Sequence, residues 1–150
     1  MAEPGIEIAG DAVTVPKKWR YERGEGRRKH LWDQDYAGFQ PSRNGCVGKC
    51  PCHVTVEIAQ KILNEEAIPV YDSDDSPFPD RFYAVYGGAV YEAVPTQPGA
   101  SYHAYPWRGD LPGRKSLSRR VLRELRRIAE YRGEIRGLER WLKKYGGPAD

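Results

Sequence analysis

The sequence has no long hydrophobic run and no export signal, and each absence narrows the kind of protein that it encodes. No apolar stretch approaches the ~18–20 residues that a membrane-spanning helix requires. The N-terminal residues 1–13 lack the basic start and the apolar segment of a signal peptide. We therefore expect no membrane span and a cytoplasmic site of action, which the chain reaches directly or as part of a larger secreted protein.

Basic residues are concentrated near the C-terminal end of the chain and are outnumbered by acidic residues elsewhere. The formal net charge is only +3, but residues 114–144 hold twelve Lys/Arg and four Glu, a balance of +8. The rest of the chain holds twelve basic and seventeen acidic residues, a balance of −5. This segregation predicts an anionic partner for the C-terminal end: nucleic acid, with RNA favoured, a membrane surface, or an acidic protein such as an inhibitor. A solvated basic helix face is the structural alternative.

The pattern of apolar residues indicates a small antiparallel sheet. Aromatic and β-branched runs at 82–86 and 89–94 are separated by Gly87 and Gly88. A Gly-Gly pair between two such runs predicts a hairpin, because both turn positions can adopt positive φ. A further run at 101–107 predicts a third strand. We expect an α+β fold with a three- or four-stranded antiparallel sheet centred on this region.

Two helical elements complete the predicted fold. Thr55 is the expected N-cap of a helix over 56–66, in which apolar residues recur at helical spacing. From Ser116, a second expected N-cap, apolar residues step by three and four as far as Tyr145. Glycine near Arg132 weakens this element, so it is either one long basic helix or a helical hairpin.

The whole chain, 1–150, has the length and composition of one domain. We expect a flexible N-terminal arm over about 1–40 and a core over about 46–145. The turn-forming residues at 33–45 predict a loop between the two.

Cys46, Cys50, Cys52 and His53 form the densest group of metal-ligand side chains, in a chain with three cysteines. Three thiolates and an imidazole are a ligand set of structural zinc. The close spacing of these residues is unusual for such a site, and His30 is an alternative fourth ligand. One other interpretation is a disulfide from Cys46 to Cys50 or Cys52. Another is that the three thiols have no role, with a reactive Cys52 just before a helix N-terminus as a minor option.

The segment 101–108 carries the residues best suited to catalysis. On a strand, His103 and Tyr105 share a face, while Tyr102 points to the other face. Metal-independent RNA cleavage needs one group to take the ribose 2′-OH proton, one to protonate the leaving oxygen, and a cation for the developing charge. Imidazole titrates near neutrality and suits proton transfer, and Arg108 or Arg81 suits the phosphate. The candidate catalytic residues are His103, Arg108, Tyr105, Tyr102 and Glu92. Whether Glu92 lies near His103 depends on the strand register. The alternative is that these residues form an ordinary half-buried sheet surface without a catalytic role.

Basic residues at two places are candidates for nucleic-acid contacts. The C-terminal helical element has one basic face, and the N-terminal segment interleaves basic residues with Trp19 and Tyr21, a combination that suits phosphate contacts with base stacking. The candidates are Arg119, Arg120, Arg123, Arg126, Arg127, Lys17, Lys18, Arg27 and Arg28.

The run VYGGAVYEAVPTQPGASYHAYPWRGDLP, at 85–112, resembles a pattern in C-terminal toxin domains of bacterial polymorphic and contact-dependent toxin systems. Some of these domains look like the compact RNase fold of barnase and the cytotoxic colicins, in which a helix packs on a small antiparallel sheet. The resemblance implies a catalytic His103 with Tyr102, Tyr105 and Arg108 nearby. The cysteine group and the helices that follow the sheet depart from that pattern.

These observations predict a toxin domain that acts on nucleic acid, as a ribonuclease whose catalysis requires no cofactor. One alternative is a non-enzymatic nucleic-acid-binding protein stabilised by zinc at the cysteine group. Another is an interaction module whose basic helix binds an acidic protein, such as an inhibitor that confers immunity.

Overall fold

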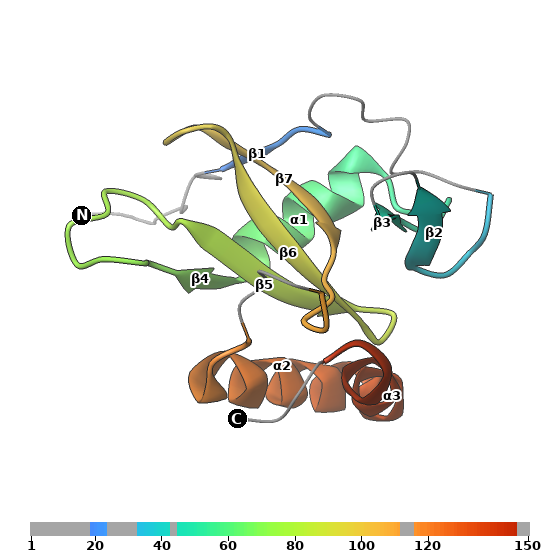
Figure 1. Ribbon diagram of the computed structural model, residues 1–150. Helices are drawn as coiled ribbons and strands as arrows, with labels where there is room; N and C mark the ends of the chain where they lie inside the picture. Colours follow the sequence, from blue (N-terminus) through green and yellow to red (C-terminus); the bar gives the residue numbers. More distant parts are fainter. Residues whose placement is uncertain (1–18, 24–32, 43–44, 112–115, 147–150) are drawn as a thin grey trace, which may run out of the picture.

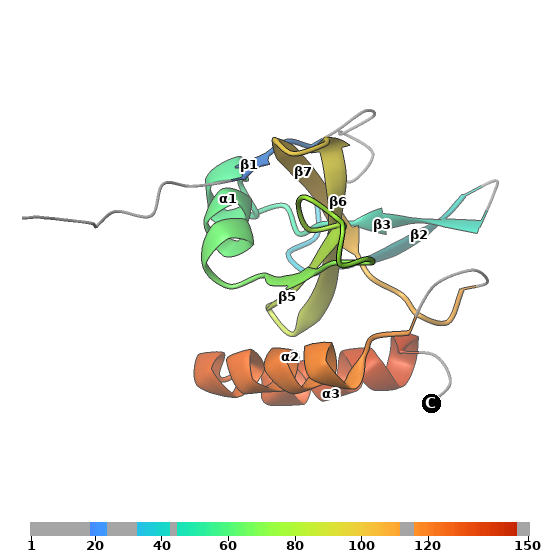
Figure 2. The same ribbon diagram turned by 90° about the vertical axis from the view of Figure 1, so that its left-hand side faces the viewer.

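The computed structural model describes residues 19–23, 33–42, 45–111 and 116–146. These residues form three layers (Figures 1 and 2): helix α1 (Val56–Glu65), a five-stranded sheet, and the helices α2 (Arg119–Arg132) and α3 (Ile135–Tyr145). Helix α1 lies on one face of the sheet, and the α2–α3 pair lies on the other. The predicted α+β class, with a packed helix and a C-terminal helical hairpin, is confirmed.

The sheet contains the predicted hairpin and third strand at its centre. Its strand order is β1-β7-β6-β5-β4, and the pairs among β4, β5, β6 and β7 are antiparallel, whereas β1 is parallel to β7. Gly87 and Gly88 have φ of 60° and 82°, so the hairpin turn has the backbone that the Gly-Gly pair predicts. The strands are β1 (Arg20–Tyr21), β4 (Ile68–Val70), β5 (Arg81–Tyr86), β6 (Ala89–Gln97) and β7 (Ser101–Pro106).

A separate two-stranded ribbon occupies part of the region predicted as a loop. Strand β2 (Gly38–Ser42) pairs with β3 (Gly45–Lys49), and Pro41 lies opposite Cys46 in their register. Proline has no N–H to donate, but each ribbon strand has one unpaired edge and tolerates it there. The turn-forming composition of 33–45 therefore concealed a strand.

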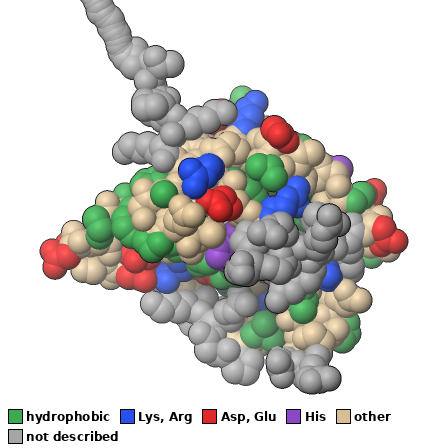
Figure 3. Space-filling view, turned by 90° about the horizontal axis from the view of Figure 1, so that it is seen from above, with side chains coloured by type: hydrophobic (Ala, Val, Ile, Leu, Met, Phe, Trp, Pro, Cys, Tyr) green, Lys and Arg blue, Asp and Glu red, His purple; other side chains and the backbone are tan. Residues whose placement is uncertain are grey.

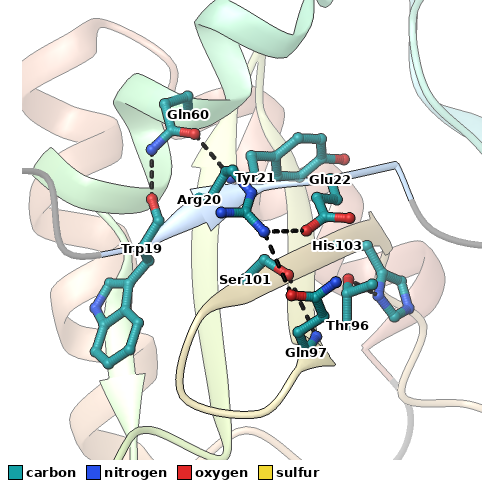
Figure 4. Close-up of polar contacts among 9 residues, drawn as sticks. All are labelled: Trp19, Arg20, Tyr21, Glu22, Gln60, Thr96, Gln97, Ser101 and His103. Carbon is teal, nitrogen blue, oxygen red and sulfur yellow. Dashed lines mark hydrogen bonds and ion pairs between the residues drawn. The ribbon is translucent and has the colours of Figure 1, made fainter.

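The predicted N-terminal arm also contains an ordered strand. Side-chain amides of α1 hold the backbone of β1: Asn64 accepts a hydrogen bond from the Trp19 amide (3.0 Å), and Gln60 accepts one from the Tyr21 amide (2.7 Å). Both side chains also donate to the Trp19 carbonyl, and Figure 4 shows the Gln60 contacts. The range 1–40 thus includes a segment that is fixed between α1 and β7. The basic residues predicted to contact nucleic acid in this range, Lys17, Lys18, Arg27 and Arg28, lie outside the described residues.

The helix boundaries follow local capping. Helix α1 begins after Thr55, whose hydroxyl accepts a hydrogen bond from the Ile58 amide (3.1 Å), as predicted. Helix α2 begins after Ser118 and not after Ser116, because the Ser118 hydroxyl is the one that accepts from the Val121 amide. Gly133, at φ 74°, ends α2 in the left-handed conformation and separates it from α3.

Apolar side chains on the two faces of the sheet form two separate clusters. Toward α2 and α3 the strands present Val85 and Val90, which pack with Leu125 and Leu138; all four are at most 1% exposed. Toward α1 the strands present a smaller cluster that includes Tyr102. Full burial of a leucine or valine side chain stabilises a fold by about 1.5–3 kcal/mol, so the α2–α3 layer contributes a large share of the core.

The hairpin turn contacts α3 through two glycines. A Cβ added to Gly88 would lie 2.9 Å from the Cα of Gly137, whereas a Cβ added to Gly87 would meet no atom of the described residues within 4 Å. We expect Gly87→Ala to lower the free energy of unfolding by about 1 kcal/mol through its positive φ, and Gly88→Ala to lower it by a further ~1–3 kcal/mol through the clash. Urea unfolding of both variants measures the difference. Equal losses would contradict a tight contact between the turn and α3.

Candidate active site on one face of the sheet

Strand register places a carboxylate and an imidazole on the same face of the sheet. In the β6–β7 ladder Glu92 lies opposite Tyr105 and Val94 lies opposite His103, while in the β5–β6 ladder Tyr83 lies opposite Glu92. Opposite residues share a face, as do alternate residues of one strand. The side chains of Tyr83, Glu92, His103 and Tyr105 therefore belong to one face, which answers the question of register that the sequence left open.

Glu92 is the centre of this group. It is 8% exposed, and its two carboxylate oxygens accept hydrogen bonds from the hydroxyls of Tyr83 (2.6 Å) and Tyr105 (2.7 Å). Burial, followed by the hydrogen bond to Glu92, raises the pKa of Tyr83 above its ordinary value, so this phenol remains a donor at neutral pH. The two phenols fix the carboxylate in one orientation.

Arg81 supplies a cation beside Glu92. It precedes Tyr83 by two residues on β5 and so lies on the same face, and it forms a two-pronged ion pair with Asp72, one contact of which is 3.1 Å. Although burial alone would lower the pKa of Arg81, the neighbouring Tyr83, Asp72 and Glu92 raise it. The Nε atom of Arg81 is buried and has no hydrogen-bond partner among the described residues. The site therefore holds a guanidinium with one donor unused by those residues.

His103 is oriented by the strand beside it. Its Nδ1 lies 2.8 Å from Thr96 Oγ1, and its ring centroid lies 6.5 Å from that of Tyr105. Thr96 occupies the irregular step of the β6–β7 ladder between Pro95 and Gln97. This contact holds the imidazole by one ring nitrogen on the half-buried surface of the sheet (Figure 4).

Strand β1 adds a second ion pair on the His103 side of the sheet. Arg20 lies opposite Ser101 in the parallel β1–β7 register, and its guanidinium pairs with Glu22 at 2.9 Å and reaches Gln97 at 3.4 Å (Figure 4). Sequence reasoning missed both charged residues as part of this site. Basic and aromatic residues around Trp19 were noted, but a two-residue strand has no periodicity that could have revealed its position.

The structure separates Tyr102 and Arg108 from this group. Tyr102 points toward α1, is fully buried and donates a hydrogen bond to the Pro79 carbonyl; burial raises its pKa to about 12. Arg108 lies beyond the end of β7, where it pairs with Asp110 (2.8 Å) and packs over the ring of Tyr145 (5.0 Å). The prediction that these two residues work beside His103 is not supported by their positions. Of the two arginines that the sequence offered for the phosphate, Arg81 is the one that lies on the same face of the sheet as Glu92.

The four residues of the predicted zinc site are all described, and they lie in different surroundings. Cys46, on β3, is 3.7 Å from Arg108 Nη1; Cys50 is buried; Cys52 and His53 are exposed. All three thiols are free, and no three His, Cys, Asp or Glu side chains of the described residues are grouped to hold a metal ion. The structure therefore gives the zinc prediction no support.

The arginines of α2 are largely engaged within the protein. Arg126 pairs with Glu139 (2.8 Å), Arg127 pairs with Glu124 (2.8 Å), and Arg120 donates to the Pro69 carbonyl (3.0 Å). Arg119 and Arg123 share the outer face of the helix with Arg126 and Arg127. On the opposite side of the molecule, seen from above in Figure 3, basic and acidic side chains likewise lie close to one another.

Comparisons with protein-family models, with characterised proteins and with solved structures gave no match to this chain. Within the described residues, no helix has the length and apolar character needed to cross a membrane. The chemistry of the site therefore has to be judged from its own geometry.

The buried thiol provides a test of the packing between α1 and the sheet. Cys50 lines an apolar cavity of about 60 Å³, and burial raises its pKa from 9.0 to about 11. This shift lowers the thiolate fraction at pH 8 by about a hundredfold. We expect iodoacetamide to modify Cys52 first and Cys50 only slowly, with the Cys50 rate rising steadily as the pH increases toward 11.

Mass spectrometry of the labelled peptides measures each thiol separately, and labelling in urea is the control in which Cys50 loses its protection. Rapid modification of Cys50 in the folded protein at pH 8 would contradict the described packing.

Proposed function

We propose that this protein is a nucleic-acid-directed toxin that cleaves RNA by acid–base catalysis, with Glu92 and His103 as the proton-transferring groups. The observation that carries the proposal is their placement on adjacent strands of one sheet face, as diagonal neighbours in the β6–β7 register. Diagonal neighbours in an antiparallel pair lie about 7–8 Å apart at the backbone, a separation that a phosphodiester can bridge.

The proposed reaction is an intramolecular transfer at phosphorus. The Glu92 carboxylate takes the proton of the ribose 2′-OH as its oxygen forms a bond to phosphorus. The imidazolium of His103 gives a proton to the 5′-oxygen as the bond from that oxygen to phosphorus breaks. The products are a 2′,3′-cyclic phosphate and a free 5′-hydroxyl, and the Arg81 guanidinium stabilises the charge that develops on the phosphorane oxygens.

The two tyrosines on Glu92 act as positioning residues in this scheme. A buried carboxylate is costly unless its oxygens are hydrogen-bonded, and Tyr83 and Tyr105 meet that requirement from the strands on either side. Both carboxylate oxygens are thereby held in one orientation, on the same face of the sheet as the imidazole of His103. Buried ionisable groups gathered in this way are common at catalytic sites, which supports the proposal.

We expect the purified protein to cleave total RNA and tRNA but not DNA, which lacks the attacking 2′-OH, and we expect chelator to leave the rate unchanged. His103→Ala and Glu92→Gln each lower kcat by about 10²-fold or more, because each removes one proton transfer. His53→Ala is the matched control, since His53 is exposed and lies outside the site. Gel analysis with detection of 2′,3′-cyclic ends measures the outcome, and expression in bacteria measures growth arrest and its relief by His103→Ala.

Full cleavage by His103→Ala would overturn the assignment of the acid. Loss of activity in the His53→Ala control would place the chemistry elsewhere in the molecule. Absence of cleavage by the unaltered protein would reject the nuclease and leave the two alternative functions, nucleic-acid binding without catalysis and binding of an acidic protein.

A further inference from the structure

A groove with aromatic walls and basic side chains lies at the opposite end of β6 from His103. It has a volume of about 590 Å³ and is bounded by three segments: the residues leading into β2, the Gly87–Gly88 turn, and one face of α3. None of the described residues that line it is acidic, whereas Arg140 and Lys144 are both exposed cations of α3. The lining of this groove thus favours an anionic occupant.

The aromatic wall is built from both sides of the groove. Phe39 of β2 lies 5.8 Å from Trp141 and 4.9 Å from Tyr145, measured between ring centroids, and the two α3 rings lie 4.5 Å apart. Tyr36, which also lines the groove, is 56% exposed. The groove thus has an exposed phenol ring and a packed aromatic cluster in its lining, and aromatic rings of this kind are surfaces on which a flat ring can stack.

Glycines keep one edge of the groove open. Gly87 at the hairpin turn is exposed, and no atom of the described residues lies within 4 Å of a Cβ added there. Gly88 and Gly137 bring the turn and α3 into backbone contact, which fixes the two sides relative to each other. The turn and α3, which form two sides of the groove, are therefore held in a fixed position relative to each other.

We propose that this groove binds single-stranded RNA, with a base stacked on Tyr36 and phosphates on Arg140 and Lys144. Aromatic platforms beside cations are the combination that binds single strands without sequence preference. The inference rests on the proposed function for its substrate. Ala89, at the groove, and Val94, opposite His103, are five residues apart on β6, or about 16 Å, a distance that a strand of several nucleotides can span.

The test measures binding separately from cleavage. Fluorescence anisotropy of fluorescein-labelled octa-adenylate is recorded with the His103→Ala protein, which leaves the RNA intact. Tyr36→Ala in this background is expected to weaken binding about tenfold or more, and Tyr36→Trp to restore it, because a larger ring preserves stacking. Tyr131→Ala is the matched control, since Tyr131 is 91% exposed but does not line the groove.

A second pair of variants tests the cations. Lys144 lines the groove, whereas the adjacent Lys143 is equally a surface lysine of α3 but does not line it. Lys144→Ala is expected to weaken binding and to reduce the slope of log K against log salt concentration by about 0.7, the value for one lost phosphate contact with a single strand. Lys143→Ala is expected to leave affinity and slope close to those of the parent.

The outcomes test RNA binding by the groove separately from RNA cleavage by the sheet face. Equal affinity of Tyr36→Ala and Tyr131→Ala for RNA would overturn the proposed binding in the groove, even where His103→Ala abolishes cleavage. Groove-dependent binding by a protein that cleaves no RNA would uphold the groove and reject the nuclease. Equally tight binding of duplex RNA, or equal displacement of the RNA by poly-glutamate, would overturn base stacking and point to an occupant recognised by charge alone.

Discussion

The register of β6 is the constraint on which the rest of the structure depends. This strand pairs with β5 on one side and β7 on the other, so its alignment decides what both faces of the sheet present. A slip of one residue would turn Glu92 toward α1, into the apolar cluster that contains Phe82 and Tyr102, and would turn its neighbours toward α2. A carboxylate in that cluster would lose the hydroxyls of both tyrosines, so the unfavourable burial of charge itself enforces the observed alignment.

The hairpin and helices were predictable from the sequence because short-range chemistry determines them. Gly87-Gly88 specifies a turn whose two positive φ values other residues adopt only at a cost, and Thr55 and Gly133 mark helix ends by capping. Strand β1 was not predictable, because two residues have no pattern and its backbone is held by amide side chains of a helix about 40 residues away. Local signals contain no information about such distant partners.

In the candidate site too, the residues set by a local pattern were predictable and those brought in by distant strand pairing were not. His103, Tyr105 and Glu92 were identified from residue type and strand alternation, which apply within a single hairpin. Arg108 was expected beside His103 because it is near in sequence, but β7 ends at Pro106 and the chain then turns away toward Tyr145. Arg81 reaches the site across the sheet, through pairings that only the register reveals. Proximity in sequence is therefore a poor guide to the composition of a site built across strands.

The charges of the site and of the helices have different consequences for binding. Arg81 and Arg20 are each paired with a carboxylate, so the surface around His103 offers a substrate little net positive charge. Ten basic and four acidic residues in 116–146 give the C-terminal helices a balance of +6. Because phosphate affinity is mainly electrostatic, we infer that attraction of RNA comes from the helices while the sheet face supplies the chemistry. In the proposed mechanism the carboxylates keep the cations of the site oriented for the transition state, and a second surface is needed to retain the substrate.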